Sequence, residues 1–475
     1  MANSALMRRP ARRTSPKRFR RPAAAPTQKP LYVGVDNGRP VRISPDPFAP
    51  KQREGGWGAY AESFLRVNGQ AFQALDVEPL LRASDSGVDV FLKPGGRAGA
   101  VPLRSAQHEQ VIGGLVVKPR FGWAGVGRVL SETGWAAAPE LIDMPLVPGS
   151  GREVPPWVIA GPVLRRLADL LASLKRGYVD AEEVLTRPRG RILWDRYRAE
   201  SLARGRWHEL PCRFPNLTAD PNLRRYVKWT LERILRALLE GADEDPMARH
   251  LVGEAKRLLL ITADVVAASP TRQRLDELAR HGGWAGPLLA RGIEAIGWIF
   301  DERGLGGGRE LDGLAWHLQL DRAWEAYVEA ITRSEAALTG GTVRVGRLGQ
   351  TVFPLHWTNP IHRTLGHLVP DIVVQKGTFI HVIDAKYKAH LAELDEHGWR
   401  SFADVTRQSH RADLHQVLAY AALFEADHIR ATLMYPLRRT TFHALAARGQ
   451  DRSIAELGYG GRRAELELRG LPFGS

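Results

Sequence analysis

The stretch VPDIVVQKGTFIHVIDAKYK, residues 369–388, decides the fold of the last third of the chain. It contains two short apolar runs, Val369–Val374 and Phe379–Ala385, both rich in valine and isoleucine. Runs of this length, separated by a few residues that include glycine, are typical of two strands joined in a β-hairpin. The sequence therefore predicts a hairpin with Gln375–Thr378 as its turn.

Two aspartates and a lysine fall on one face of this predicted hairpin. With the turn centred between residues 376 and 377, Asp371 is expected to lie opposite Val382. Asp384 and Lys386 follow Val382 at steps of two residues, and residues two apart in a strand project from the same face. Diagonal neighbours across a strand pair lie about 7–8 Å apart at their backbones. The two carboxylates are therefore expected to come close enough to share one cation.

These three charges need partners, because burying an unpaired charge is expensive. The residues alone leave two readings open, a salt-bridged structural cluster or a metal site. Oxygen-only ligands suit Mg²⁺ or Mn²⁺ better than Zn²⁺. A lysine beside such a cation can position an attacking water or stabilise the charge that develops on a phosphate. The combination indicates metal-dependent phosphodiester hydrolysis.

Helical and strand patterns flank the hairpin, in a domain that we place at residues 306–475. A helix is expected over Leu318–Ala337, before the hairpin. A second helix at Ala412–Phe424 and a strand at Ile429–Tyr435 are expected after it. This order predicts a mixed α/β domain.

The motifs of this domain resemble the PD-(D/E)XK nucleases. Asp371 matches the first acid of that signature, Asp384 the second and Lys386 the lysine. Glu325, in the helix DRAWEAYVEA, matches the acid that many members place on their first helix. The resemblance implies that Asp371, Asp384 and Glu325 hold the metal and that Lys386 orients a water near the scissile phosphate.

The resemblance extends to the McrC type, the nuclease subunit of modified-cytosine restriction systems. The motifs of that type occur here in order: Trp324-Glu325, Pro370-Asp371, Asp384–Lys388, Asp413–Tyr420 and Tyr435-Pro436. Gln416 and Tyr420 match the Q-x-x-x-Y motif, and their spacing of four places them on one helical face. The resemblance implies that both assist catalysis.

The McrC-type resemblance implies a multi-domain α/β protein whose last domain is a restriction-endonuclease-like mixed sheet flanked by helices. It implies a Mg²⁺-dependent DNA endonuclease, with Mn²⁺ as a possible substitute. It also implies a partner, a McrB-like AAA+ GTPase hexamer that translocates DNA and whose hydrolysis the subunit stimulates. The chain has no G-x-x-x-x-G-K-[ST] loop, which agrees with nucleotide hydrolysis by a separate protein.

Three further regions precede the nuclease-like domain. Residues 1–30 hold nine Lys and Arg and no acid, and are expected to form a disordered basic tail. Residues 31–150 are expected to be β-rich and to dock the partner, and residues 151–305 to form a helical middle stalk. The clearest middle helix starts near Asn222, and a flexible loop is expected at Gly304–Gly308.

Composition limits the remaining possibilities. The chain has 67 Lys and Arg against 52 Asp and Glu, which favours a polyanion as a partner. It has one cysteine and no apolar run long enough to cross a membrane, so we expect a cytoplasmic protein. Two alternatives to a restriction nuclease stay open: a non-cutting scaffold that activates a partner NTPase, and a DNA-repair nuclease with the same core.

Overall fold

The computed structural model describes most of the 475 residues. The described ranges are 29–48, 57–58, 60–85, 87–150, 153–174, 177–218, 221–243, 245–301, 312–358, 361, 364–392, 404–459 and 462–474. The predicted basic tail, apart from residues 29 and 30, and the predicted loop at Gly304–Gly308 lie outside them.

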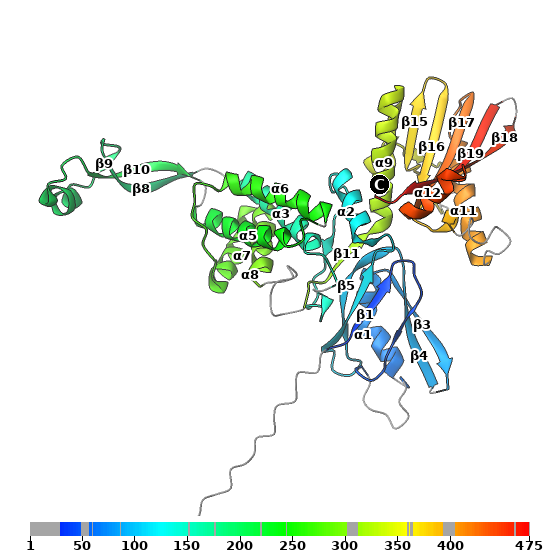
Figure 1. Cartoon of the computed structure of the whole chain (residues 1–475), viewed down its shortest axis with the longest axis horizontal. Helices are drawn as coiled ribbons and strands as arrows, with labels where there is room; N and C mark the ends of the chain where they lie inside the picture. Colours follow the sequence, from blue (N-terminus) through cyan, green and yellow to red (C-terminus); the bar gives the residue numbers. More distant parts are fainter. Residues whose placement is uncertain are drawn as a thin grey trace, which may run out of the picture.

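The N-terminal region is built on two sheets that enclose one helix (Figure 1). The strands and helices of this region are β1 (Leu31–Val35), β2 (Val41–Ile43), α1 (Tyr60–Ala74), β3 (Val77–Ser84), β4 (Gly87–Pro94), β5 (Arg97–Arg104), β6 (Val111–Lys118), α2 (Gly122–Glu132) and β7 (Glu140–Leu141). The larger sheet has the order β1-β6-β5-β11-β7, and the smaller one has the order β2-β4-β3. The predicted β-rich character is confirmed.

Strand β11 (Trp316–Gln319) comes from much later in the chain and completes the larger sheet. It pairs antiparallel with β5, with Trp316 opposite Ala100. The two strands approach so closely that a Cβ on Gly99 would lie 2.2 Å from the carbonyl oxygen of Trp316, so this position requires glycine. The chain continues directly from β11 into α9 (Leu320–Thr339), so the N-terminal sheet and the last region share one continuous segment.

The middle region packs helices into a bundle. The bundle helices are α3 (Trp157–Ser173), α5 (Pro221–Leu239), α6 (Pro246–Ile261), α7 (Arg272–Ala285) and α8 (Pro287–Phe300). The predicted helix near Asn222 is α5, and its apolar stripe is buried at Leu223, Val227, Leu231 and Ile234. None of the described helices is long and apolar enough to cross a membrane.

The expectation that the whole middle region is helical is wrong between α3 and α5. There, β8 (Gly177–Leu185) and β10 (Leu210–Thr218) pair antiparallel, and β9 (Arg191–Ile192) adds two residues at the edge of β10. We call residues 177–218 the arm, because they extend away from the helix bundle (Figure 1). Charged residues in β8 and two prolines in β10 hide the strand pattern in the sequence.

The last region is a six-stranded mixed sheet with helices on both faces. Its order is β12-β15-β16-β17-β19-β18, and β16, β17 and β19 run parallel. The bounds are β12 (Thr342–Val345), β15 (Ile372–Lys376), β16 (Phe379–Ala385), α11 (Asp404–Ala421), β17 (His428–Leu437), α12 (Arg439–Ala447), β18 (Arg452–Tyr459) and β19 (Arg462–Pro472). A separate two-stranded ribbon joins β13 (Phe353–Pro354) and β14 (His367–Leu368). The predicted mixed α/β class is confirmed.

Two helices cover the part of this sheet that carries the predicted site. Val417 and Tyr420 of helix α11 belong to one buried hydrophobic cluster with Val373 and Val382 of the sheet. Helix α9 covers the opposite face, and its core is continuous with that of the helix bundle and of the N-terminal sheet. The helix bundle and the N-terminal sheet therefore both pack against the helix that supports the predicted site.

Candidate active site

The hairpin predicted from the sequence forms, but with a different register. Ile372 pairs with Ile383 and Lys376 with Phe379, so Asp371 faces Asp384 directly and the predicted pairing of Asp371 with Val382 is wrong. The cause is the turn, which consists of Gly377 and Thr378 and lies one residue later than predicted. Gly377 adopts a φ of +59° at the first turn position, where tight hairpins favour glycine. Each residue therefore pairs with a partner two positions later than predicted, which keeps both aspartates on one face and brings them closer together.

Asp384 and Lys386 form an ion pair at the end of β16. The Asp384 side chain is 1% exposed, and its Oδ2 lies 2.8 Å from the Lys386 Nζ. The backbone N–H of Lys386 donates to the Met434 carbonyl at 2.9 Å, which extends the pairing with β17 past the end of β16. Lys386 is therefore fixed at its backbone and directed towards the carboxylates.

Helix α11 brings Gln416 and Tyr420 to the same lysine. Lys386 Nζ donates to Gln416 Oε1 at 2.9 Å, and Gln416 Nε2 donates to the Tyr420 hydroxyl at 2.8 Å. Burial raises the pKa of Tyr420 above its ordinary value. The structure thus links three of the predicted residues in one chain of hydrogen bonds.

Among the acids of the site, Asp371 has the pKa that is raised furthest from its ordinary value. Its Oδ2 accepts a hydrogen bond from the backbone N–H of Ala385 at 2.9 Å. Burial raises the pKa of Asp371 well above its ordinary value of 3.8, and the negative charges of Asp384 and Glu325 raise it further. Adjacent acids that repel one another in this way are stabilised by a bound cation.

Glu325 lies on α9, half-buried, close enough to Asp371 for its charge to act there. Burial raises the pKa of Glu325, and the nearby Arg347 partly opposes that shift. Arg347 itself is bound by the buried Glu329. Arg347 Nε donates to Glu329 Oε2 at 2.5 Å, and Arg347 Nη2 donates to Glu329 Oε1 at 3.0 Å. Because Arg347 is bound to Glu329, the Glu325 carboxylate can contribute to a cation site together with the two aspartates.

The donor set consists of carboxylate oxygens, which suit a hard divalent cation. Asp384 Oδ2 is buried and accepts no hydrogen bond of good geometry, its contact being the ion pair with Lys386. Within the described ranges, no three His, Cys, Asp or Glu side chains are already gathered into a metal-binding group. The facing pair of aspartates has the donor chemistry that fits Mg²⁺, which proteins bind through one or two carboxylates, with water and substrate phosphates completing its shell.

The segment that contains this site matches a known family. Residues 301–436 match the family described as McrBC 5-methylcytosine restriction system component. The match is confined to this segment of the chain. This match confirms the resemblance of the motifs, and it includes both aspartates, Lys386, Glu325 and the α11 pair.

Solved structures of the same system resemble the chain only loosely. One is the refined half-complex from a tetradecameric assembly of Thermococcus gammatolerans McrB AAA+ hexamers with bound McrC, with 14% identity, a TM-score of 0.38, and coverage of 93% of this chain and 94% of that chain. Another is the Thermococcus gammatolerans McrBC complex, with 12% identity, a TM-score of 0.27, and coverage of 64% and 87%. At TM-scores this low the likeness supports no conclusion about this chain. No curated protein matches the chain significantly.

One residue of the matched segment was missed as a site residue from the sequence. Asp413 is buried on α11, and its two oxygens accept hydrogen bonds from Lys388 Nζ at 2.8 and 2.7 Å. It also lies 4.0 Å from Lys386 Nζ. Burial lowers the pKa of Lys386, but the charges of Asp384, Asp413 and Asp371 together raise it above its ordinary value. Asp413 leads the motif that contains Gln416 and Tyr420, which was the signal available in the sequence.

The N-terminal region reaches the site through Tyr387, which stands between the two lysines. The Arg120 guanidinium lies 4.4 Å from the centre of the Tyr387 ring, and its Nε lies 3.6 Å from Asp36 Oδ2. The side chain of Asp36 is fully buried and that of Arg120 is 12% exposed. Phe121 and Phe473 pack around the same tyrosine. These contacts fix the strand end that carries Lys386 to the N-terminal sheet.

Arg120→Ala is expected to lower the free energy of unfolding by about 3–5 kcal/mol, because it leaves the buried Asp36 without its cation. Denaturant unfolding of the full chain measures this. Arg42→Ala is the matched control, since its pair with Asp89 is exposed and should contribute about 0–1 kcal/mol. Equal effects of the two substitutions would show that the Asp36–Arg120 contact contributes no more than a surface pair.

Proposed function

We propose that the chain is a Mg²⁺-dependent DNA endonuclease subunit of an McrBC-like restriction system, with a restriction-endonuclease-like last domain. One observation carries the proposal. Asp371 and Asp384 face each other across two strands, with the Lys386 ammonium 2.8 Å from Asp384 and held by Gln416. The McrBC-family match over the same residues supports the proposal.

In the proposed mechanism, Asp371 and Asp384 hold Mg²⁺, with help from Glu325. When bound to these carboxylates, Mg²⁺ would supply Lewis-acid chemistry, polarising a phosphate oxygen and making water more acidic. Lys386 orients the attacking water and stabilises the charge that develops on the phosphate oxygens. Gln416 holds the lysine in place through its amide oxygen, and Tyr420 fixes the amide.

The experiment that tests this function is DNA cleavage by the full chain with its AAA+ partner. We expect cutting of duplex DNA in Mg²⁺, and none when a chelator removes the cation. Methylated and unmethylated duplexes should be compared, because recognition of modified cytosine distinguishes restriction from repair. A non-cutting scaffold predicts no cutting under any of these conditions, with full stimulation of the partner's NTPase, and that result would contradict the proposal.

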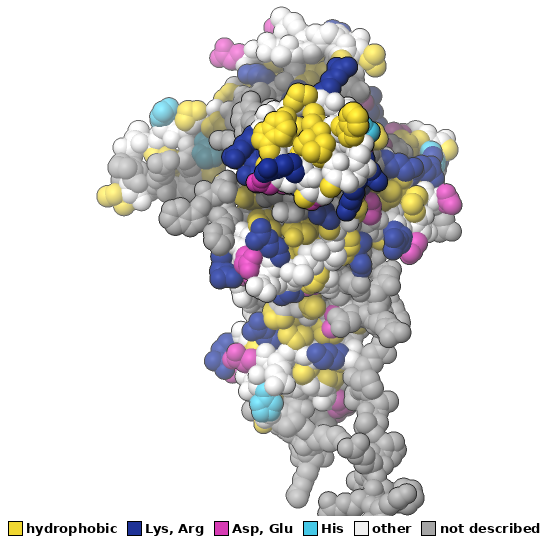
Figure 2. Space-filling model, turned by 90° about the vertical axis from the view of Figure 1, so that its left-hand side faces the viewer, with side chains coloured by type: hydrophobic (Ala, Val, Ile, Leu, Met, Phe, Trp, Pro, Cys, Tyr) yellow, Lys and Arg dark blue, Asp and Glu magenta, His cyan; other side chains and the backbone are white. Residues whose placement is uncertain are grey.

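We further propose that the partner is a McrB-like AAA+ GTPase hexamer; one of the Thermococcus gammatolerans structures contains McrB AAA+ hexamers with bound McrC. Docking of the partner by residues 31–150 stays a prediction, and the described surface favours the arm as a further contact. Three large apolar side chains at the arm are at least half exposed: Trp194 at 60%, Leu202 at 50% and Trp207 at 72%. Figure 2 shows a group of hydrophobic side chains on the face that points along the arm, bordered by Lys and Arg. Exposed apolar groups rimmed by charge are characteristic of protein interaction surfaces.

Trp207→Ala is expected to weaken binding to the AAA+ partner about 30-fold, the effect of losing one tryptophan hot spot. The affinity is measured between the full chain and the assembled hexamer in the presence of nucleotide. Leu338→Ala provides the control, because this leucine is 89% exposed at the end of α9, away from the arm. Equal affinity of Trp207→Ala and the unsubstituted chain would exclude the arm tip as the contact.

A further inference from the structure

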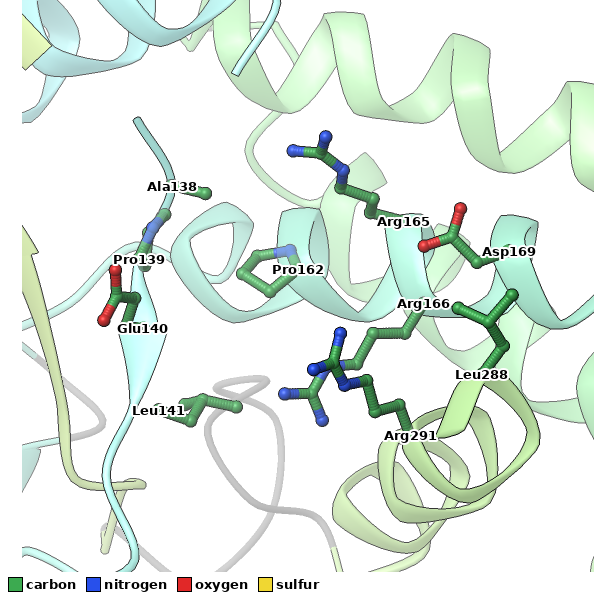
Figure 3. Close-up of a pocket in the computed structure, with 10 residues that line it drawn as sticks. All are labelled: Ala138, Pro139, Glu140, Leu141, Pro162, Arg165, Arg166, Asp169, Leu288 and Arg291. Carbon is green, nitrogen blue, oxygen red and sulfur yellow. The ribbon is translucent and has the colours of Figure 1, made fainter. Parts of the chain in front are cut away.

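A cavity of about 530 Å³ lies where the N-terminal sheet meets the helix bundle. Strand β7 forms one wall, and helices α3 and α8 form the other. Figure 3 shows the guanidinium groups of Arg166 and Arg291 extending towards Leu141 and Glu140 on β7. The cavity is separate from the candidate active site, because none of its lining residues belongs to the last sheet or to α9 and α11.

Arg166 is held in place by contacts outside the cavity. Its Nη1 donates to Glu294 Oε2 at 2.7 Å, and its guanidinium lies 4.4 Å from the centre of the Trp298 ring. A guanidinium packed against an aromatic face loses little further freedom when it binds an anion. Its remaining N–H groups can therefore bind a ligand at little additional cost in entropy.

Arg291 enters the same space from α8 and is exposed. Within the described part of the chain, no oxygen accepts a hydrogen bond from it and no carboxylate pairs with it. Two guanidinium groups that share one cavity repel each other, and an anion placed between them relieves that repulsion. Arginine recognises phosphate through paired N–H groups, which makes phosphate the anion that this pair fits best.

Two acids also line the cavity and reduce its positive charge. Glu140 lies opposite the arginines, with its Oε2 3.5 Å from His317 Nε2. Asp169 lies with Arg165 on the other side of α3 in Figure 3, away from Arg166 and Arg291. Three arginines and two acids line the cavity, and Glu294 outside the lining pairs with Arg166, so Arg291 is the arginine that contributes most of the uncompensated positive charge.

We propose that this cavity binds a phosphate of the DNA backbone, at a distance from the point of cleavage. The inference rests on the proposed function, since DNA is the polyanion that a nuclease must hold. Strand β7 pairs with β11, and β11 continues directly into the helix that carries Glu325. A phosphate bound against β7 would therefore be connected, through β11 and α9, to the candidate active site.

The test measures the affinity of the full chain for duplex DNA without divalent cations, between 50 and 200 mM salt. Each lost phosphate contact should make the slope of log K against log salt shallower by about one unit. We expect this for Arg291→Ala and for Arg166→Gln. Glu140→Gln should tighten binding, because it removes the opposing charge. Arg42→Ala, which removes an equal charge from the N-terminal sheet, should leave the slope unchanged.

Slopes and affinities that stay the same in Arg291→Ala and Arg166→Gln would overturn the proposal. So would GTP binding that Arg291→Ala abolishes while DNA binding is unaffected, since the ligand would then be a free nucleotide. Because the assay contains no divalent cation, it reports on this cavity even if the chain proves unable to cut DNA.

Discussion

Lys386→Ala is expected to lower the rate of the proposed Mg²⁺-dependent DNA cleavage by about 10²- to 10³-fold, the effect of removing one preorganised group that stabilises developing charge. The expectation follows from the position of the ammonium group, 2.8 Å from Asp384 and 2.9 Å from Gln416 Oε1. Binding of DNA should change much less, because one charge is a small part of the total contact with the backbone. Cleavage rates under single-turnover conditions separate these two effects.

The control for Lys386→Ala is Lys376→Ala. Lys376 lies on the same hairpin, but it is exposed at the turn end. Removing Lys386 also leaves Asp384 buried without its cation, so thermal unfolding must show that the variant is folded at the assay temperature. A folded Lys386→Ala variant that cuts DNA at the full rate would contradict the assignment of this site.

Asp371→Asn is expected to have opposite effects on activity and stability. Cleavage should be lost, because one of the two facing carboxylates that hold the cation is gone. The metal-free protein should become more stable, because burial and the charges of Asp384 and Glu325 disfavour an ionised Asp371. Addition of Mg²⁺ should raise the melting temperature of the unsubstituted chain but not that of the variant.

The raised pKa of Asp371 also fixes the sign of a pH dependence in the metal-free protein. Above pH 3.8 the unfolded chain loses this proton, while the folded chain retains it up to its higher pKa. The folded state binds more protons across that window, so this group makes stability fall as pH rises through it. Asp371→Asn should flatten this part of the profile, whereas Asp195→Asn, at a side chain that is 96% exposed, should not. Identical profiles for Asp371→Asn and the unsubstituted chain would show that Asp371 is not perturbed.

Local patterns in the sequence predicted much of the last region. Strand β16 has the predicted bounds, Phe379–Ala385, because a short run rich in valine and isoleucine next to a turn favours a buried strand. The predicted register was wrong because the register depends on which residue occupies the first turn position. When the turn moves by one residue, each residue pairs with a partner two positions further along. The prediction that Asp371 and Asp384 lie on the same face is confirmed, because a shift of two residues in the pairing leaves each side chain on its original face.

The contacts between regions could not be predicted. Arg120 meets Tyr387 only because the N-terminal sheet packs against the end of β16, and no local pattern encodes that packing. The same holds for β11, which lies beside β5 although more than 200 residues separate them in the chain. The arm was missed because its strands lack the apolar alternation of half-buried strands. The division of the chain at residues 150 and 305, and the catalytic roles of the site residues, stay predictions.

The most direct test of the central claim is the position of a bound cation, located by the anomalous scattering of Mn²⁺ in crystals of the full chain. We expect one Mn²⁺ in contact with carboxylate oxygens of both Asp371 and Asp384, at about 2.1 Å, the distance usual for small hard cations. A well-ordered crystal soaked in Mn²⁺ that shows no cation between these two side chains, with Lys386 still bound to Asp384, would contradict it.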